Sequence, residues 1–159
     1  MSNMKDALGR TIDYMRISVT DRCNLRCKYC MPYGVECVPR WDILSLEEIR
    51  AVGICAASLG IRHIKVTGGE PLVRRDCCQL VKQLKSTPGI EKVTITTNGV
   101  LLERYLDDLT EAGIDGINIS LDTLDRDLYQ RITGTDALGT VTEAVRRACA
   151  MPVSVKINA

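Results

Sequence analysis

Five short segments of this 159-residue chain alternate between apolar and polar residues, and helix-like segments separate them. The alternating segments cover residues 14–20, 63–67, 92–96, 116–122 and 153–158. Helices are expected over 45–60, around 77–85, around 102–112, near 125–132 and over 140–150. Because strands joined by crossover helices pair in parallel, the pattern predicts an α/β fold whose sheet winds toward a barrel.

The alternation divides each predicted strand into an apolar and a polar face. The apolar positions are Met15, Ile17, Val19, Ile64, Val66, Val93, Ile95, Ile117, Ile119, Leu121, Val153, Val155 and Ile157. Parallel strands covered on both faces usually read as continuous apolar runs, so helices are expected to cover only one face here. The polar residues then line either a wet cavity or the solvent-facing side of an open sheet. Arg16, Lys65 and Lys156 on this face would suit a cavity that holds an anionic ligand.

The first predicted helix carries clear boundary signals. Ser45 and Glu48 have the spacing of a capping box, and Gly60 is expected to end the helix. The predicted buried stripe consists of Leu46, Ile49, Val52, Ala56 and Leu59.

Composition limits the class of protein. The chain is 45% hydrophobic and 26% charged, with 21 Lys and Arg against 20 Asp and Glu, which fits one soluble domain. Without long basic runs or an apolar membrane span, we expect a small-molecule ligand, neither nucleic acid nor membrane as a partner, and a cytoplasmic location. Because cytosolic thiols stay reduced, the eight cysteines indicate metal ligands or core residues. Core positions are predicted for Cys55, Cys77 and Cys149.

Three cysteines lie in the stretch CNLRCKYC, residues 23–30, directly after the first strand. Parallel α/β folds place their active sites at this carboxyl end of the strands. Three thiolates can hold three irons of a 4Fe-4S cluster and leave the fourth iron open to another ligand. A zinc site would have to recruit Cys37 or His63, and a redox pair of Cys27 and Cys30 would leave Cys23 without a role. Ligand count favours the cluster, and all three interpretations stay open.

Further loops at strand ends carry TGGEP (67–71), TTNG (96–99) and SLD (120–122). Two glycines allow the backbone to approach a ligand closely, and the Glu70 carboxylate could pair with an ammonium group. By itself the GGEP stretch predicts only a tight turn.

Together these motifs resemble the radical S-adenosylmethionine (SAM) superfamily. Cys23, Cys27 and Cys30 form its CxxxCxxC pattern, with Tyr29 before the last thiol and GGEP at 68–71. The stretches MRISVTDRCNLRCKYCMP, VTGGEPLVRRD, TTNG and INISLD narrow the resemblance to the GTP 3′,8-cyclase family of molybdenum cofactor biosynthesis, from about residue 9 to the end of the chain.

The resemblance implies a radical SAM lyase. In such enzymes a 4Fe-4S cluster, reduced by an external one-electron reductant, cleaves SAM to a 5′-deoxyadenosyl radical that takes the ribose 3′ hydrogen of GTP. The resemblance assigns the cluster to Cys23, Cys27 and Cys30. By motif match, SAM lies against Tyr29, Gly68, Gly69, Glu70 and Ser120, and GTP lies against Arg16, Lys65, Thr96 and Lys156.

The chain departs from the family in two respects. Lys65 stands where arginine is common, which keeps the charge but loses the planar fork. The family also continues for about as long again, so residues 1–159 are expected to be an incomplete core domain, a partial TIM-like barrel of about five strands with an unpaired final edge. A second cluster is expected only in the missing part, together with a possible homodimer of the full-length form. The chain alone is expected to be inactive.

Two other functions remain open at this point. One is a different radical SAM reaction, such as peptide modification, and the other is a zinc-binding module without catalytic activity.

Overall fold

The computed structural model describes residues 4–30 and 37–159. Five strands form one sheet in the order β1-β2-β3-β4-β5, and every neighbouring pair is parallel. The strands are β1 (Tyr14–Ser18), β2 (His63–Thr67), β3 (Lys92–Thr97), β4 (Gly116–Ser120) and β5 (Ser154–Asn158). The prediction of parallel strands alternating with helices is confirmed, and the sheet is open rather than closed.

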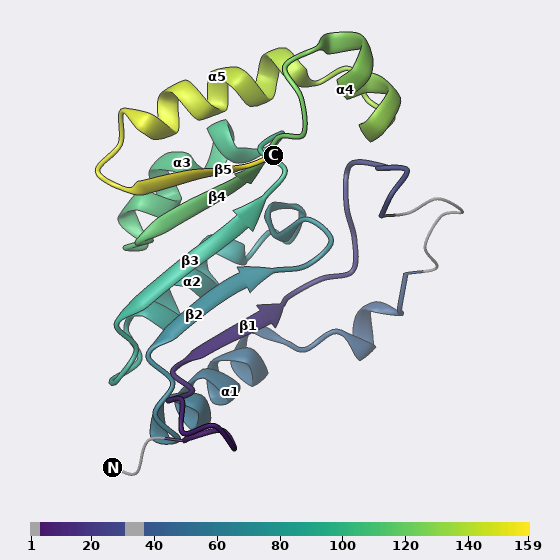
Figure 1. Cartoon of the computed structure of the whole chain (residues 1–159). Coiled ribbons are helices and arrows are strands. Elements are labelled where there is room, and N and C mark those ends of the chain that lie inside the picture. Colours follow the sequence, from purple (N-terminus) through teal and green to yellow (C-terminus); the bar gives the residue numbers. More distant parts are fainter. Residues whose placement is uncertain (1–3, 31–36) are drawn as a thin grey trace.

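Helices connect successive strands and lie on one side of the sheet (Figure 1). They are α1 (Leu46–Ser58), α2 (Cys77–Lys85), α3 (Leu102–Glu111) and α5 (Leu138–Cys149), while the short α4 (Arg126–Thr133) lies near the carboxyl ends of the strands. Two 3-10 turns, η1 (Arg40–Asp42) and η2 (Pro71–Val73), precede α1 and α2. Within the described residues, no helix is long and apolar enough to cross a membrane.

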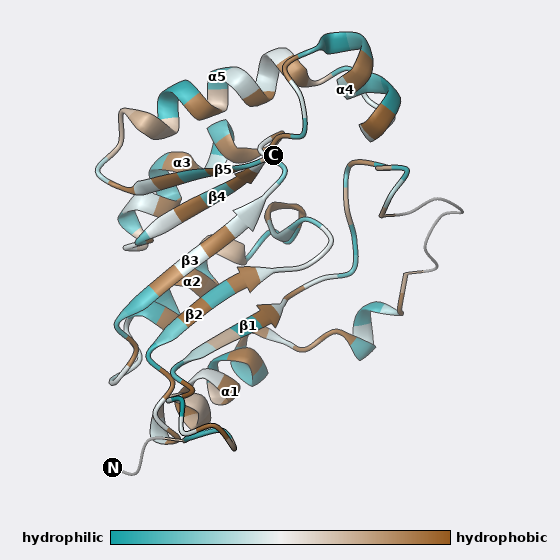
Figure 2. Ribbon diagram, viewed as in Figure 1, coloured by the Kyte–Doolittle hydropathy of each residue, from teal (hydrophilic) through white to brown (hydrophobic). Residues whose placement is uncertain are grey.

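The apolar strand positions pack against these helices, as the alternation predicts. Figure 2 shows hydrophobic and hydrophilic positions alternating along the strands. The fully buried side chains include Ile64, Ile95, Ile117 and Ile119 from the strands and Leu80, Leu84, Leu106 and Leu109 from the helices. The opposite face carries polar side chains, and Figure 1 shows that the described helices leave it uncovered. The functional side chains can therefore be sought on this face and at the carboxyl ends of its strands.

Details of α1 differ from the sequence expectation. The capping box is confirmed, because Ser45 Oγ accepts from Glu48 N and the Glu48 carboxylate accepts from Ser45 N. However, Val52 and Leu59 are exposed, and the buried face continues through Gly53 instead. A glycine there lets α1 approach α2 closely, since an added Cβ would lie 2.7 Å from Leu84 Cδ2.

The core prediction for three cysteines is correct only for Cys77. Its thiol is buried, and burial raises its pKa to about 12. Cys55 and Cys149 are exposed, because they lie on the outer faces of α1 and α5. Cys77 is therefore a structural, unreactive thiol.

Candidate functional site

The cysteine loop, residues 23–30, runs across the carboxyl ends of the strands and is held on both sides. After β1, Val19 N donates to Thr67 O at 2.9 Å. Beyond Cys23, Leu25 is buried, and the amides of Arg26 and Lys28 donate to the carbonyls of Thr133 and Ile132, each at 2.9 Å. The loop is thus fixed between β1 and the end of α4.

The glycine pair of GGEP packs directly against the segment that leads into this loop. Gly69 N donates to Thr20 O and Glu70 N donates to Arg22 O, both at 2.7 Å. A Cβ on Gly68 would lie 2.5 Å from Thr20 O, and one on Gly69 would lie 2.4 Å from Arg22 O. Both approaches are to backbone atoms, so neither position has room for a side chain.

Glu70 is a buried carboxylate that connects two strand-end loops. Its side chain is 1% exposed and accepts hydrogen bonds from Leu72 N at 3.1 Å, Thr97 Oγ1 at 2.8 Å and Asn98 N at 2.6 Å. Burial raises its pKa, and these hydrogen bonds lower it in part. Both oxygens are thus already engaged in holding the loops after β2 and β3, and the expected pairing of Glu70 with an ammonium group stays a prediction.

Asn98 continues this connection to the first cysteine. Its Nδ2 lies 3.6 Å from Cys23 Sγ and donates to Asn24 Oδ1 at 2.8 Å. Cys23 Sγ also accepts from Leu25 N at 3.4 Å. The TTNG motif alone does not single out Asn98. The signal in the sequence is an amide side chain in a strand-end loop, on the same rim as the thiols.

The three thiols of the loop lie near one another. Cys23 and Cys27 are half-buried and Cys30 is exposed, and Cys30 N donates to Cys27 O at 3.0 Å in a tight turn. Burial raises the pKa of Cys27, and the neighbouring Cys23 and Cys30 thiols raise it further. Across residues 4–30 and 37–159, no three Cys, His, Asp or Glu side chains are already gathered as a metal site. The thiols would therefore have to draw together around an iron–sulfur cluster, for which thiolates are the usual ligands.

His63 cannot supply a fourth ligand to this loop. It begins β2, and its Nδ1 lies 3.9 Å from Asp13 Oδ2 at the amino end of the sheet. The cysteine loop lies at the other end of the strands, roughly 13 Å away at the rise of a parallel strand. This removes one of the two candidates for the fourth ligand of a zinc site.

Two predicted residues lie near the end of β4. Tyr29 from the cysteine loop donates its hydroxyl to Asp122 Oδ2 at 3.0 Å, although the residue is 68% exposed. Ser120, the last residue of β4, is half-buried two positions earlier. The loop, GGEP and the end of β4 therefore border the same rim.

The predicted cationic residues lie across the polar face of the sheet. Arg16 on β1 pairs in register with Lys65 on β2, while Thr96 on β3 and Lys156 on β5 both align with Asn118 between them. Arg16 and Lys156 are exposed and Lys65 is half-buried. Among the described residues, none of these three cations has an ion-pair partner. Like charges on directly opposed residues are unfavourable, so this face suits an anion.

Comparison with known sequences identifies relatives of this chain. Residues 17–159 match the family described as the Radical SAM superfamily. The chain is 46% identical over 159 residues to the GTP 3′,8-cyclase of Erythrobacter litoralis (strain HTCC2594), covering 99% of this chain and 48% of that protein. It is 47% identical over 157 residues to the GTP 3′,8-cyclase of Moorella thermoacetica (strain ATCC 39073 / JCM 9320), covering 98% and 49%. The chain thus spans about half the length of these curated relatives.

Solved structures share the fold. Streptococcus suis SuiB bound to precursor peptide SuiA superposes with a TM-score of 0.76 at 23% identity, over 92% of this chain and 32% of that one. Methylornithine synthase (PylB) superposes with a TM-score of 0.71 at 20% identity, over 91% and 43%. At these identities the likeness concerns the fold alone.

Proposed function

Because this chain belongs to the radical SAM superfamily, we propose that its cysteine loop holds a 4Fe-4S cluster through Cys23, Cys27 and Cys30. Membership in this superfamily supports a 4Fe-4S cluster and SAM as the cofactors. When bound, the cluster would supply the electron that cleaves SAM. We further propose that residues 1–159 are the amino-terminal part of a GTP 3′,8-cyclase that takes GTP as substrate and an external one-electron reductant as donor.

One observation carries this proposal more than any other. The three thiols share a single loop, and that loop borders a sheet face whose cations lack ion-pair partners among the described residues. A closed structural metal site needs four protein ligands, whereas three thiolates leave one iron for the amino and carboxylate groups of SAM. The anionic substrate then has a cationic face beside the cofactor.

The chain's own residues would position SAM in two ways. The exposed backbone of Gly68 and Gly69, together with Tyr29 and Ser120, borders the rim where the cofactor would lie. Glu70 would act through the backbone, since its buried carboxylate fixes the loops after β2 and β3. In this proposal Glu70 is a positioning residue rather than a direct contact.

The substrate would lie across the polar face. Arg16 and Lys65 are directly opposed, so a triphosphate between them would relieve their repulsion. Lys156 and Thr96 lie at the far side of the same face, two strands apart. A second cluster belongs, in this proposal, to the part of the relatives that this chain does not match.

Lys156→Ala in a protein of the relatives' full length tests the substrate assignment. Loss of one charge-assisted contact should weaken GTP binding by about tenfold or more, with iron and sulfide content unchanged. The matched control is Lys82→Ala, because Lys82 is exposed on α2, behind the opposite face of the sheet. Equal GTP affinity in the two variants would contradict the assignment of Lys156. Loss of iron in both the Lys156 and the Lys82 variant would instead indicate a folding defect. GTP binding would then be measured in Lys156→Arg, which keeps the positive charge and should keep the affinity.

A further inference from the structure

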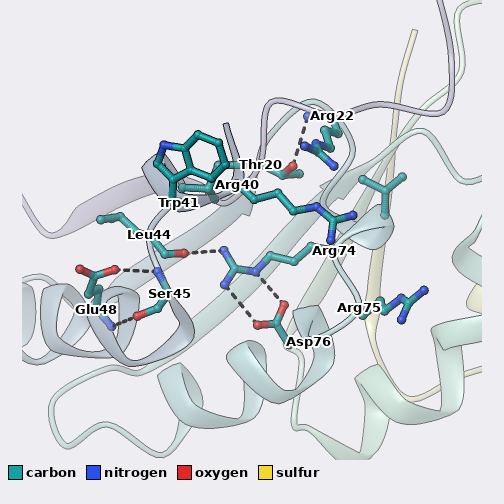
Figure 3. A pocket seen from close by; sticks show the side chains of 12 residues that line it. Thr20, Arg22, Arg40, Trp41, Leu44, Ser45, Glu48, Arg74, Arg75 and Asp76 are labelled. Carbon is teal, nitrogen blue, oxygen red and sulfur yellow. Dashed lines mark hydrogen bonds and ion pairs between the residues drawn. The ribbon is translucent and has the colours of Figure 1, made fainter. Parts of the chain in front are cut away.

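A pocket of about 640 Å³ lies outside the site described above. Its walls come from the segment between β1 and Cys23, from η1 and the start of α1, and from the segment between η2 and α2 (Figure 3). It includes none of the residues proposed to hold the cluster, SAM or GTP. Its volume is typical of a small-molecule site.

The pocket is lined by four arginines, and only one of them is paired. Arg74 holds Asp76 through two contacts, at 2.7 and 3.2 Å, and donates to Val19 O and Leu44 O. The side chains of Arg22, Arg40 and Arg75 have no ion-pair partner among residues 4–30 and 37–159.

The acidic groups of the pocket are already engaged. Asp76 is bound by Arg74, which lowers the pKa of its carboxyl. Glu48 accepts from Ser45 N at 2.7 Å as part of the capping box of α1. The lining has four guanidinium groups against the two carboxylates of Asp76 and Glu48, so it carries an excess of two positive charges.

Arg22 brings a partly desolvated guanidinium group to the pocket. Its residue is half-buried, and among the described residues neither its buried Nε nor the buried Oδ1 of the neighbouring Asp21 has a hydrogen-bond partner. A cation that is partly removed from water and has no ion-pair partner favours an anion at its accessible end. Figure 3 shows Arg22 and Arg40 reaching into the same pocket, where their planar guanidinium groups could share the oxygens of one anion.

Trp41 adds an aromatic surface at the rim. Its side chain is 85% exposed, although it lines the pocket beside Arg40. An exposed indole offers a face on which a planar ring can stack.

We propose that this pocket binds a small phosphate-bearing anion, held by Arg22, Arg40 and Arg75. Its concave shape favours a small molecule over the surface of an acidic protein. The phosphate groups can come from inorganic pyrophosphate or from a nucleotide whose base stacks on Trp41. Because Arg22 immediately precedes Cys23, an occupant of the pocket borders the cysteine loop.

The chain's single tryptophan makes the proposal directly testable. Trp41 fluorescence in the cluster-free chain is titrated with inorganic pyrophosphate and, separately, with adenosine diphosphate. Both probes should give a saturable change in fluorescence, and their affinity should fall when salt is added. If adenosine diphosphate binds more tightly than pyrophosphate, and calorimetry shows that Trp41→Leu loses this difference, the ligand is a nucleotide whose base stacks on Trp41. If the two probes bind with equal affinity, only the phosphate groups are recognised.

The double variant Arg40→Gln/Arg75→Gln should weaken binding of both probes by about tenfold or more. Both side chains are exposed, so the fold should be kept, which circular dichroism checks. Arg50→Gln is the matched control, because Arg50 is an exposed α1 arginine that does not line the pocket. Lys65→Gln/Lys156→Gln should also leave this fluorescence change intact, which separates the pocket from the proposed substrate face.

Three results would overturn the proposal: no saturable change with either probe, equal affinity in the Arg40/Arg75 variant, or a loss caused only by the Lys65/Lys156 variant. A response to poly-L-glutamate but to neither phosphate probe would also contradict it and indicate an acidic protein partner. Since no cluster is needed, failure here leaves the proposed cyclase function untouched.

Discussion

Glu70 and Asn98 connect two loops to the first cysteine through side-chain hydrogen bonds. Glu70 accepts from Thr97, which lies 27 residues later, and Asn98 reaches Cys23, which lies 75 residues earlier. Sequence reasoning selected the three thiols because their spacing is local. The burial of Glu70 and the contact of Asn98 with Cys23 could not be predicted in this way, because a residue's burial and its distant partners depend on how the loops are brought together.

Asn98→Ala should lower the reduction potential of the bound cluster. The variant removes an N–H donor to Cys23 Sγ, and such hydrogen bonds favour the more negative, reduced state. The measurement is a redox titration followed by electron paramagnetic resonance, with iron content determined in parallel. Asn24→Ala is the control, because it removes the other partner of Asn98 and keeps the contact with Cys23. If both variants match the unaltered protein, Asn98 has no influence on the cluster.

Glu70→Gln should destabilise the fold by about 1–3 kcal/mol at pH 7, because a buried backbone or hydroxyl donor loses its acceptor. Urea unfolding measures the change. Glu111→Gln, at an exposed position that ends α3, should stay within about 0.5 kcal/mol. A similarly small effect at Glu70 would mean that its hydrogen bonds contribute little.

The unaltered protein and Glu70→Gln should also differ in how their stability depends on pH. Burial raises the folded-state pKa of Glu70 above its ordinary value of 4.5. In the window above 4.5 the folded state binds more protons than the unfolded state, so stability falls as pH rises through the folded pKa. The Gln variant lacks this contribution. The stability difference between the unaltered protein and Glu70→Gln should therefore widen as pH is lowered from 7 toward 4.5, and a constant difference would argue against a raised pKa.

Helix and strand boundaries were largely predictable, because caps and glycines mark them in the sequence. Ser45 and Glu48 fix the start of α1, and glycines with positive φ at 60, 113 and 134 follow α1, α3 and α4. The buried face of α1 was predicted less well. A pattern of apolar side chains selects Val52, whereas close approach to α2 selects Gly53.

Two helical glycines should respond differently to alanine. Gly139→Ala on α5 should stabilise the fold by about 0.5–1 kcal/mol, because alanine favours the helix and its Cβ would meet nothing within 4 Å. Gly53→Ala should gain less or lose stability, because its Cβ would lie 2.7 Å from Leu84 Cδ2. Thermal unfolding measures the stability of both variants. An equal gain in stability at the two positions would show that α1 and α2 are not closely packed at Gly53.

At the scale of the whole described chain, one architectural feature brings the proposed cluster and SAM residues to the same edge of the sheet. All five strands run parallel, so their carboxyl ends share one edge, and the cysteine loop, GGEP, TTNG and the end of β4 meet there. The alternating strand pattern predicted which face would be polar. It could not predict the arginine pocket, because that pocket forms only where three separate segments meet beside β1.

Electron paramagnetic resonance of the anaerobically reconstituted chain tests the cofactor assignment most directly. After iron and sulfide are incorporated and the cluster is reduced, we expect a 4Fe-4S signal that shifts when SAM is added, because one iron has no thiolate from the protein. Cys27→Ala should abolish the signal. A spectrum indifferent to SAM, or a chain that takes up zinc but no iron and sulfide, would contradict this account.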